Sequence, residues 1–236
     1  MTDYFVVDKD IENLLPQDTL AFDGRVRIGS RAKISVGTRI EPPVLVASGA
    51  RILDGVSIGK YSYVGRNTIV TRADIGCFCS IAHDCQINYF RGHPMDWLST
   101  HTFQYDRDNF AFWSGYSGFT KQHFDGDTTQ AKVVIGADVW LGAGVYIFGG
   151  VTIGSGAIIG ARAMVQRDIP AYGVAVGAPA KVKNYRFDQK LIEKLLAIEW
   201  WTLDESLLRD LPFYDVNRCL ELLDERTLNS KSSPGI

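Results

Sequence analysis

The stretch VIGADVWLGAGVYIFGGVTIGSGAIIGARAMV, residues 134–165, repeats one pattern every six residues. An aliphatic side chain recurs at the same place in each repeat, and a smaller or β-branched residue follows it four positions later. The aliphatic residues are Ile135, Leu141, Ile147, Ile153, Ile159 and Val165. The smaller residues are Val139, Val145, Val151, Ala157 and Ala163.

The N-terminal half carries the same pattern, with one residue dropped before Ile75. Its aliphatic residues are Ile28, Ile34, Ile40, Val46, Ile52, Ile58, Val64, Val70, Ile75, Ile81 and Ile87. Its smaller residues include Ala32, Thr38, Val44, Ala50, Val56, Ser62 and Thr68. Glycine often follows the aliphatic residue directly, at Gly29, Gly59, Gly65, Gly76, Gly136, Gly142, Gly154 and Gly160.

A period of six is typical of neither a helix nor an ordinary strand, because apolar residues recur at three and four in a helix and at two in a strand. It is typical of a short strand followed by a tight turn. Three such units close a triangular coil, and successive coils stack on one another. The aliphatic residue then points into the interior, and glycine serves turns that need close approach or positive φ. We therefore expect a mainly-β parallel β-helix rather than a β-sandwich.

Composition narrows the function classes. The chain has 236 residues and a formal net charge of −2, which offers no electrostatic reason to bind nucleic acid or an anionic membrane. The N-terminus, MTDYFVVDKDIENLLPQ, lacks the basic-then-apolar layout of a secretory signal. The four cysteines form no secreted disulfide framework and are expected to be free thiols. We expect a cytoplasmic protein.

Five segments resemble a known family. VIGADVWLGAGVYIFGGVTIGSGAIIGARAMV, RDIPAYGVAVGAPAKV and RFDQKLIEKLLAIEWW are similar to the hexapeptide-repeat acyltransferase superfamily. CFCSIAHDCQI and GHPMDWLSTHTF resemble its xenobiotic acetyltransferase branch, which includes chloramphenicol and streptogramin acetyltransferases and is related to sugar O-acetyltransferases. The resemblance covers roughly residues 58–210. It implies a left-handed parallel β-helix, a homotrimer with active sites between subunits, and acetyl-CoA as donor.

The repeat is interrupted by a long insertion, at about residues 88–134. Long excursions in a compact array are usually functional or disordered. This one is rich in aromatic side chains, which must be buried on the helix wall, on another subunit or under a ligand. Packing at a trimer interface and stacking on sugar rings or flat drugs remain alternatives. The aromatic residues of the insertion are Tyr89, Phe90, Trp97, Phe103, Tyr105, Phe110, Phe112, Trp113, Tyr116, Phe119 and Phe124.

His93, in the insertion, aligns with the family's catalytic histidine. A neutral imidazole can take the proton of an acceptor hydroxyl as it attacks the thioester, and a backbone N–H of a repeat turn can stabilise the oxyanion. No nucleophile–base pair is visible, so direct transfer is expected. A second group must hold the other ring nitrogen, and either Asp96 or a backbone carbonyl can do so.

The donor site is assigned by resemblance. Gly142, Ala143, Gly160 and Ala161 are expected to line the groove for the pantetheine arm, although they can equally be only tight corners of the coil. Trp140 points outward and is expected at the donor arm, the acceptor pocket or an interface. Arg167, Lys181 and Arg186 are candidates for the CoA phosphates, with scattered surface charge as the alternative.

A metal site is not expected. Cys79 and Cys85 fall on the small inward position, which makes them core residues. Zinc-dependent γ-type carbonic anhydrases share this architecture, but their chemistry needs three converging histidines. The acetyltransferase motifs argue against that reading and against a non-catalytic scaffold.

Residues 188–236 change period and form a C-terminal helical extension and tail beside the acyltransferase domain of residues 1–187. Asp188 is expected to cap one helix, and a second helix is expected to begin near Asp215. Our hypothesis for the whole chain is an acetyl-CoA-dependent O-acetyltransferase that acts on a saccharide hydroxyl of a capsule, lipopolysaccharide or similar glycan. The alternative is an antibiotic-resistance O-acetyltransferase that acts on a chloramphenicol-type or streptogramin-type acceptor.

Overall fold

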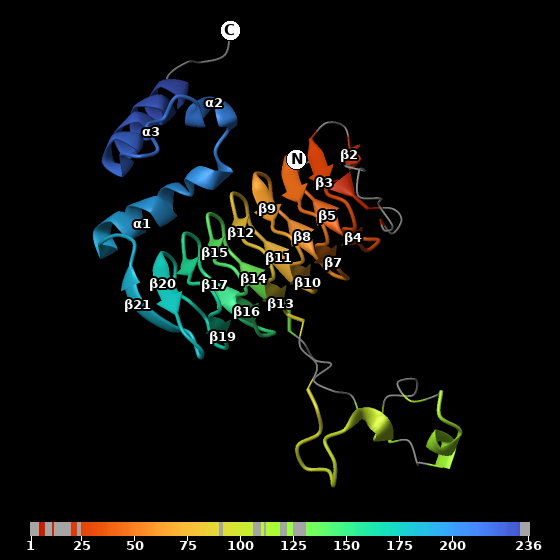
Figure 1. Cartoon of the computed structure of the whole chain (residues 1–236). Helices are drawn as coiled ribbons and strands as arrows, with labels where there is room; N and C mark the ends of the chain where they lie inside the picture. Colours follow the sequence, from red (N-terminus) through yellow and green to blue (C-terminus); the bar gives the residue numbers. More distant parts are fainter. Residues whose placement is uncertain are drawn as a thin grey trace. The chain divides into compact units, whose positions relative to one another are not determined.

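The computed structural model describes residues 5–7, 11, 20–22, 25–89, 92–105, 110, 112–118, 122–124 and 131–231 (Figure 1). The chain divides into two compact units, Met1–Arg186 and Phe187–Ile236. The first unit is a parallel β-solenoid of about seven turns, so the expectation of a mainly-β parallel β-helix is confirmed. Short strands form three sheets, and each coil contributes one strand to each sheet.

Strands that are three apart in the repeat lie side by side, as Figure 1 shows for β7, β10 and β13. The first sheet contains β1 (Phe5–Val6), β5 (Arg39–Ile40), β8 (Ser57–Ile58), β11 (Ala73–Ile75), β14 (Val133–Ile135) and β17 (Thr152–Ile153). The second contains β4 (Lys33–Ile34), β7 (Arg51–Ile52), β10 (Ile69–Val70), β13 (Gln86–Ile87), β16 (Tyr146–Ile147) and β19 (Met164–Val165).

The third sheet is extended by antiparallel strands at both of its edges. It contains β2 (Leu20–Phe22), β3 (Val26–Ile28), β6 (Val44–Val46), β9 (Ser62–Val64), β12 (Ser80–Ile81), β15 (Trp140–Leu141), β18 (Ile158–Ile159), β20 (Gly173–Val176) and β21 (Lys181–Tyr185). β2 pairs with β3, and β21 pairs with β20, in antiparallel fashion. These outer strands carry no six-residue signal and were not predicted.

The interior follows the repeat. Every aliphatic residue of both runs is buried, and so is every smaller residue four positions later that the sequence pattern identified. Two of the buried hydroxyls at the smaller position, those of Ser62 and Thr68, find partners on the next coil, whereas the hydroxyl of Thr38 donates to the carbonyl of Ser35 in its own coil. Ser62 Oγ, for example, donates to the carbonyl of Gly76 over 2.7 Å and accepts from the amide of Cys79 over 2.9 Å. The predicted core is confirmed.

Glycines serve two different purposes in the coils. A Cβ on Gly76 would lie 2.7 Å from the amide nitrogen of Ala137, and backbone of Gly136 is equally close. This glycine is needed because neighbouring coils approach closely. Gly37 has a φ of +80° and open space around the position of its missing Cβ, so it is needed only for its backbone conformation.

The second unit is helical. It contains α1 (Gln189–Ile198), α2 (Glu205–Leu208) and α3 (Val216–Lys231). Asp188 caps α1 by accepting from the amide of Leu191 over 3.0 Å, and Asp215 accepts from the amide of Arg218 over 3.0 Å, so both predicted helix starts are confirmed. Residues 232–236 of the predicted tail lie outside the described residues. None of the described helices has the length and apolar character needed to cross a membrane.

Candidate active site

The insertion leaves the solenoid after β13 in the second sheet and returns to β14 in the first. Buried Asn88 joins the outgoing and returning chains, because its side-chain amide donates to the carbonyls of Arg72 and Ala131 over 3.0 and 3.3 Å. On the return, Lys132 forms a 2.6 Å ion pair with Asp74. Both ends of the insertion are therefore anchored on the coils by polar side chains.

Tyr89 continues this anchor on the outer face of the second sheet. Tyr146 Oη donates to the carbonyl of Tyr89 over 3.0 Å, and the guanidinium of Arg51 lies 5.7 Å from the centre of the Tyr89 ring. Burial raises the pKa of Tyr146, which keeps the phenol in its neutral, donating form. The first residues of the insertion are thus tied to β7 and β16, which lie on opposite sides of β13 in the second sheet.

His93 is exposed in the single chain, and its ring is held from one side. Its Nδ1 atom lies 2.8 Å from the carbonyl oxygen of Thr100 and 2.8 Å from Tyr105 Oη. A carbonyl oxygen can only accept, so Nδ1 must carry the hydrogen and Nε2 must present its lone pair. Of the two groups considered for orienting His93, the backbone carbonyl is the one in contact.

The segment that carries the Thr100 carbonyl has its own hydrogen bonds. Gln104 Nε2 donates to the carbonyl of Ser99 over 2.8 Å, and the amide of His101 donates to Ser99 Oγ over 3.1 Å. The His101 ring accepts from the amide of Phe103 over 3.2 Å and so caps the 3-10 turn Thr102–Gln104. His101 therefore has a structural role here.

Two groups of aromatic residues pack together within the described part of the insertion. Trp97, Tyr105 and Phe124 pack against one another beside His93, with ring centroids 4.8–6.0 Å apart. Phe110 contacts His101, Phe112 and Tyr116, of which Tyr116 is buried. Phe90 and Phe119 lie outside the described residues.

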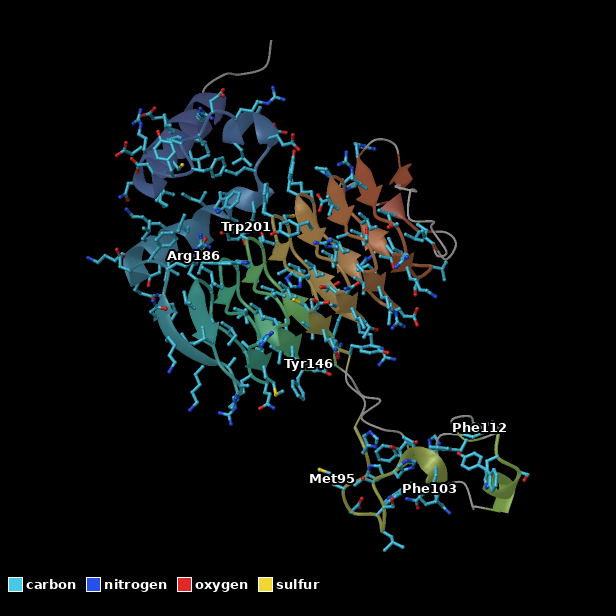
Figure 2. All side chains as sticks on the ribbon, in the orientation of Figure 1. Met95, Phe103, Phe112, Tyr146, Arg186 and Trp201 are labelled. Carbon is cyan, nitrogen blue, oxygen red and sulfur yellow. The ribbon has the colours of Figure 1, made fainter. Side chains whose placement is uncertain are left out.

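Several large side chains of the insertion are exposed in a single chain (Figure 2 labels Met95 and Phe112). The exposed fraction is 94% for Met95, 83% for Phe112 and 65% for Trp113. The sequence led us to expect that the aromatic side chains of the insertion are buried. Within a single chain, Phe112 and Trp113 are not. Exposed apolar groups of this size are typical of a surface that meets a partner or ligand.

The four small residues assigned to the donor groove meet at one corner, where the third sheet turns into the second. The amide of Gly142 donates to the carbonyl of Ile159, and the amide of Arg162 donates to the carbonyl of Ala143, each over 2.8 Å. Gly142 and Ala143 therefore stack on Gly160 and Ala161 of the next coil. Gly142 is buried and a Cβ there would lie 2.6 Å from the amide of Ala161, whereas Ala161 is exposed.

Trp140 lies immediately before this corner on β15. Its outward orientation is confirmed, with an exposed fraction of 53%. Its neighbours on the outer face of the third sheet are Ser80 and Ile158. Trp140 and Ala161 are exposed, whereas Ala143 and Gly160 are only partly exposed and Gly142 is buried. Which ligand these residues contact stays a prediction.

The three candidate cations differ in their surroundings. Arg186, which Figure 2 labels, is paired within the solenoid. Its Nη1 atom lies 2.8 Å from Asp138 Oδ2 and donates over 2.8 Å to the carbonyl of Gly156, and its guanidinium packs 5.3 Å from the Tyr172 ring centre. Arg186 thus joins coils of the solenoid. Arg167 is exposed in the turn after β19, and Lys181 is exposed at the start of β21.

Two of the three cysteines of the solenoid are core residues, and Cys77 is partly buried. Cys79 and Cys85 are fully buried, and their thiols face the carbonyls of Gly136 and Gly142 over 3.1 and 3.3 Å. Burial raises the pKa of the Cys79 thiol to about 12, which makes it a poor metal ligand. In the described part of the chain no three His, Cys, Asp or Glu side chains converge as a metal site would require.

Comparison with known proteins adds to this geometry. The family model for the bacterial transferase hexapeptide (six repeats) matches residues 132–167. A chloramphenicol acetyltransferase from Escherichia coli is 34% identical over 178 residues, which are 67% of this chain and 81% of that relative. A probable macrolide acetyltransferase from Lysinibacillus sphaericus is 38% identical over 60% of this chain and 72% of that protein. A hexapeptide-repeat acetyltransferase structure from Vibrio cholerae is 22% identical, with a TM-score of 0.42 over 63% of this chain and 70% of that one.

The coil and the relatives agree on the class of protein, a hexapeptide-repeat acetyltransferase. More particularly, the chain belongs to the hexapeptide-repeat acyltransferase superfamily in its xenobiotic acetyltransferase branch. Three residues of the candidate site were not recognised from the sequence: Asn88, the carbonyl of Thr100, and Tyr105 as a partner of His93. Tyr105 had been noted only as one aromatic among many.

Proposed function

We propose that the protein transfers the acetyl group of acetyl-CoA directly to a hydroxyl of a saccharide, with His93 as general base. The observation that carries this proposal is the ring geometry of His93. The Thr100 carbonyl, 2.8 Å from Nδ1, leaves Nε2 as an acceptor. Such a nitrogen can remove a proton from a hydroxyl that is otherwise a weak nucleophile.

The reaction needs a second proton movement and a stabilised oxyanion. As the hydroxyl oxygen attacks the thioester carbonyl, its proton passes to Nε2, and the resulting imidazolium returns a proton to the departing CoA thiolate. A backbone N–H at a repeat corner is our candidate donor to the oxyanion. Acetyl-CoA supplies the activated acetyl group, and the chain supplies the base, the orientation of its ring and the backbone N–H that meets the oxyanion.

We further propose that the enzyme works as a homotrimer with active sites between subunits. Support comes from the apolar side chains that one chain leaves in contact with water, among them Met95, Leu98, Phe112 and Trp113. A neighbouring solenoid would cover them and would bring His93 to a donor corner of another subunit.

The four cysteines are free, as expected in the reducing cytoplasm, where we place the reaction.

A saccharide acceptor is favoured by the composition of the insertion. The packed rings of Trp97, Tyr105 and Phe124 lie beside His93, and flat aromatic faces suit the apolar faces of sugar rings. The coils from β3 to β10 extend the solenoid away from the corner of Gly142 and Gly160 and add surface for a longer acceptor.

An antibiotic is the second candidate for the acceptor, because several similar proteins are named as antibiotic acetyltransferases. The names of the similar proteins refer to chloramphenicol, macrolide and virginiamycin A acetyltransferases. Each of those acceptors would also present a hydroxyl to His93, so the same base chemistry applies. The two candidates differ in what the aromatic insertion recognises.

An acceptor panel separates them. Release of CoA thiol is measured with acetyl-CoA and, in turn, glycans with free hydroxyls, chloramphenicol, a macrolide and a streptogramin. We expect enzyme-like turnover, of the order of 10 s⁻¹, with at least one glycan and only slow turnover with the antibiotics. If chloramphenicol were acetylated fast and no glycan were acetylated, the saccharide proposal would be contradicted, while the proposed role of His93 would stand.

Lys181 tests the donor side. If its ammonium meets a CoA phosphate, Lys181→Ala should raise the Kd for CoA by up to about fivefold at low salt, because an exposed charge pair contributes about 1 kcal/mol at most. The difference should shrink as salt screens the pair. Titration calorimetry at two ionic strengths measures it, with Lys194→Ala, an exposed lysine on α1, as the matched control. Identical affinities for Lys181→Ala and the wild type would remove Lys181 from the donor site.

A further inference from the structure

We propose that Tyr105 is a positioning residue for His93: its phenol oxygen is a second acceptor for the Nδ1 hydrogen and helps to stabilise the imidazolium that forms during acetyl transfer. This inference rests on the proposed role of His93 as general base. It assigns a function to a side chain that the repeat and its motif leave without one. Tyr105 lies twelve positions after His93, at the end of the 3-10 turn Thr102–Gln104.

Three oxygen and nitrogen atoms meet at this point. Tyr105 Oη lies 2.8 Å from His93 Nδ1 and 3.5 Å from the carbonyl oxygen of Thr100, which is itself 2.8 Å from Nδ1. Because the carbonyl only accepts, the ring hydrogen resides on Nδ1 and is shared between two oxygens. The phenol hydrogen is then directed to the Thr100 carbonyl. This arrangement keeps Nε2 unprotonated and available.

The opposite arrangement shows why the pair of acceptors matters. With a phenol alone beside it, Nδ1 could accept the phenol hydrogen, and the ring hydrogen would move to Nε2, where it blocks the base. The Thr100 carbonyl excludes the tautomer with the hydrogen on Nε2. Tyr105 adds a second acceptor for the Nδ1 hydrogen without adding a negative charge. When Nε2 takes the substrate proton, hydrogen bonds from the charged ring strengthen.

The Tyr105 ring is held independently of its hydroxyl. Its centroid lies 6.0 Å from that of Trp97 at an interplanar angle of 83°, and 4.8 Å from that of Phe124. Its amide also donates to the carbonyl of Thr102 over 3.0 Å. Phenylalanine at this position would therefore keep the ring contacts and lose only the oxygen, which makes the substitution a clean test.

The test compares Tyr105→Phe with Tyr116→Phe, which removes a phenol oxygen from another tyrosine of the same insertion. We expect Tyr105→Phe to lower kcat by about tenfold, because one hydrogen bond to a developing charge is lost. The KM for acetyl-CoA and the melting temperature should stay unchanged. Tyr116→Phe should keep kcat near the wild-type value. Tyr105→Leu, which also removes the ring contacts, should lower kcat further.

A spectroscopic readout separates positioning from general loosening of the insertion. In protein labelled with 15N-histidine, the His93 signals are assigned by their loss in His93→Gln. We expect the Nδ1 signal of His93 to move in Tyr105→Phe and to stay in place in Tyr116→Phe.

The outcomes distinguish this inference from the proposal beneath it. If Tyr105→Phe has wild-type kcat and an unchanged Nδ1 signal while His93→Ala is inactive, Tyr105 has no positioning role, although His93 remains the base. If His93→Ala is itself active, the proposed function fails and the inference fails with it. A fall in kcat that is equal in Tyr105→Phe and Tyr116→Phe would also overturn the inference.

Discussion

Replacing His93 by alanine is expected to lower kcat by about 10²–10⁴-fold, because general-base assistance typically contributes that much. The hydroxyl would have to attack the thioester without losing its proton to a fixed acceptor. The KM for acetyl-CoA should change little, since the residues assigned to the donor groove lie on the coils and not on the insertion. Steady-state release of CoA thiol with the acceptor identified from the panel measures both quantities.

His123→Ala is the matched control, because His123 is an exposed histidine of the same insertion. We expect it to retain wild-type kcat, and circular dichroism should give the same melting temperature for both variants. Near-normal turnover in His93→Ala would remove His93 from the mechanism. Loss of activity in both variants would indicate that the insertion as a whole, rather than one imidazole, is sensitive to substitution.

Gly76→Ala is expected to destabilise the solenoid strongly. The added Cβ would lie 2.7 Å from the amide nitrogen of Ala137 and from the carbonyl carbon of Gly136, and 2.8 Å from the carbonyl oxygen of Gly136. All three atoms are backbone, so no side chain can rotate away and neighbouring coils must separate. Overpacking costs about 1–3 kcal/mol, and a clash with three backbone atoms is expected at about 3 kcal/mol, the upper end of that range.

Thermal unfolding followed by circular dichroism checks this prediction. About 3 kcal/mol corresponds to a fall in melting temperature of roughly 6–12 °C for a domain of this size. The control is Gly37→Ala, because nothing lies within 4 Å of its added Cβ and only the φ of +80° opposes the change. That strain costs about 1–2 kcal/mol. Equal melting temperatures for the two variants would show that close approach of the coils does not limit this position.

The solenoid interior could be predicted in detail from the sequence, for a physical reason. Each coil packs only on its neighbours, so the position within six residues decides whether a side chain points inward. Ile147 and Ala157 occupy different positions of the repeat, and both are fully buried as their positions require. The cap at Asp188 was equally predictable, because a helix start depends on a few adjacent residues.

The edges of the solenoid could not be predicted in this way. β1 pairs with β5 in antiparallel fashion, and β21 folds back on β20. Neither strand has a periodic signal in the sequence, because each covers the edge of a sheet only once and is not part of a repeated coil. Arg186 is a related case: its ion pair with Asp138 joins residues that are 48 positions apart, and no local pattern relates them.

The sequence by itself determined the coil, its core, the place where the coil is interrupted and the one histidine that matches a catalytic motif. Regular spacing carries that information, because identical local geometry recurs in every repeat. Only the tertiary structure decided which group orients His93. Asp96 is nearer in the chain, but the ring meets the carbonyl of Thr100 and the phenol of Tyr105 because the insertion turns back on itself between residues 93 and 105. Contacts made by such a reversal depend on the path of the backbone, and the six-residue repeat of the sequence carries no information about that path.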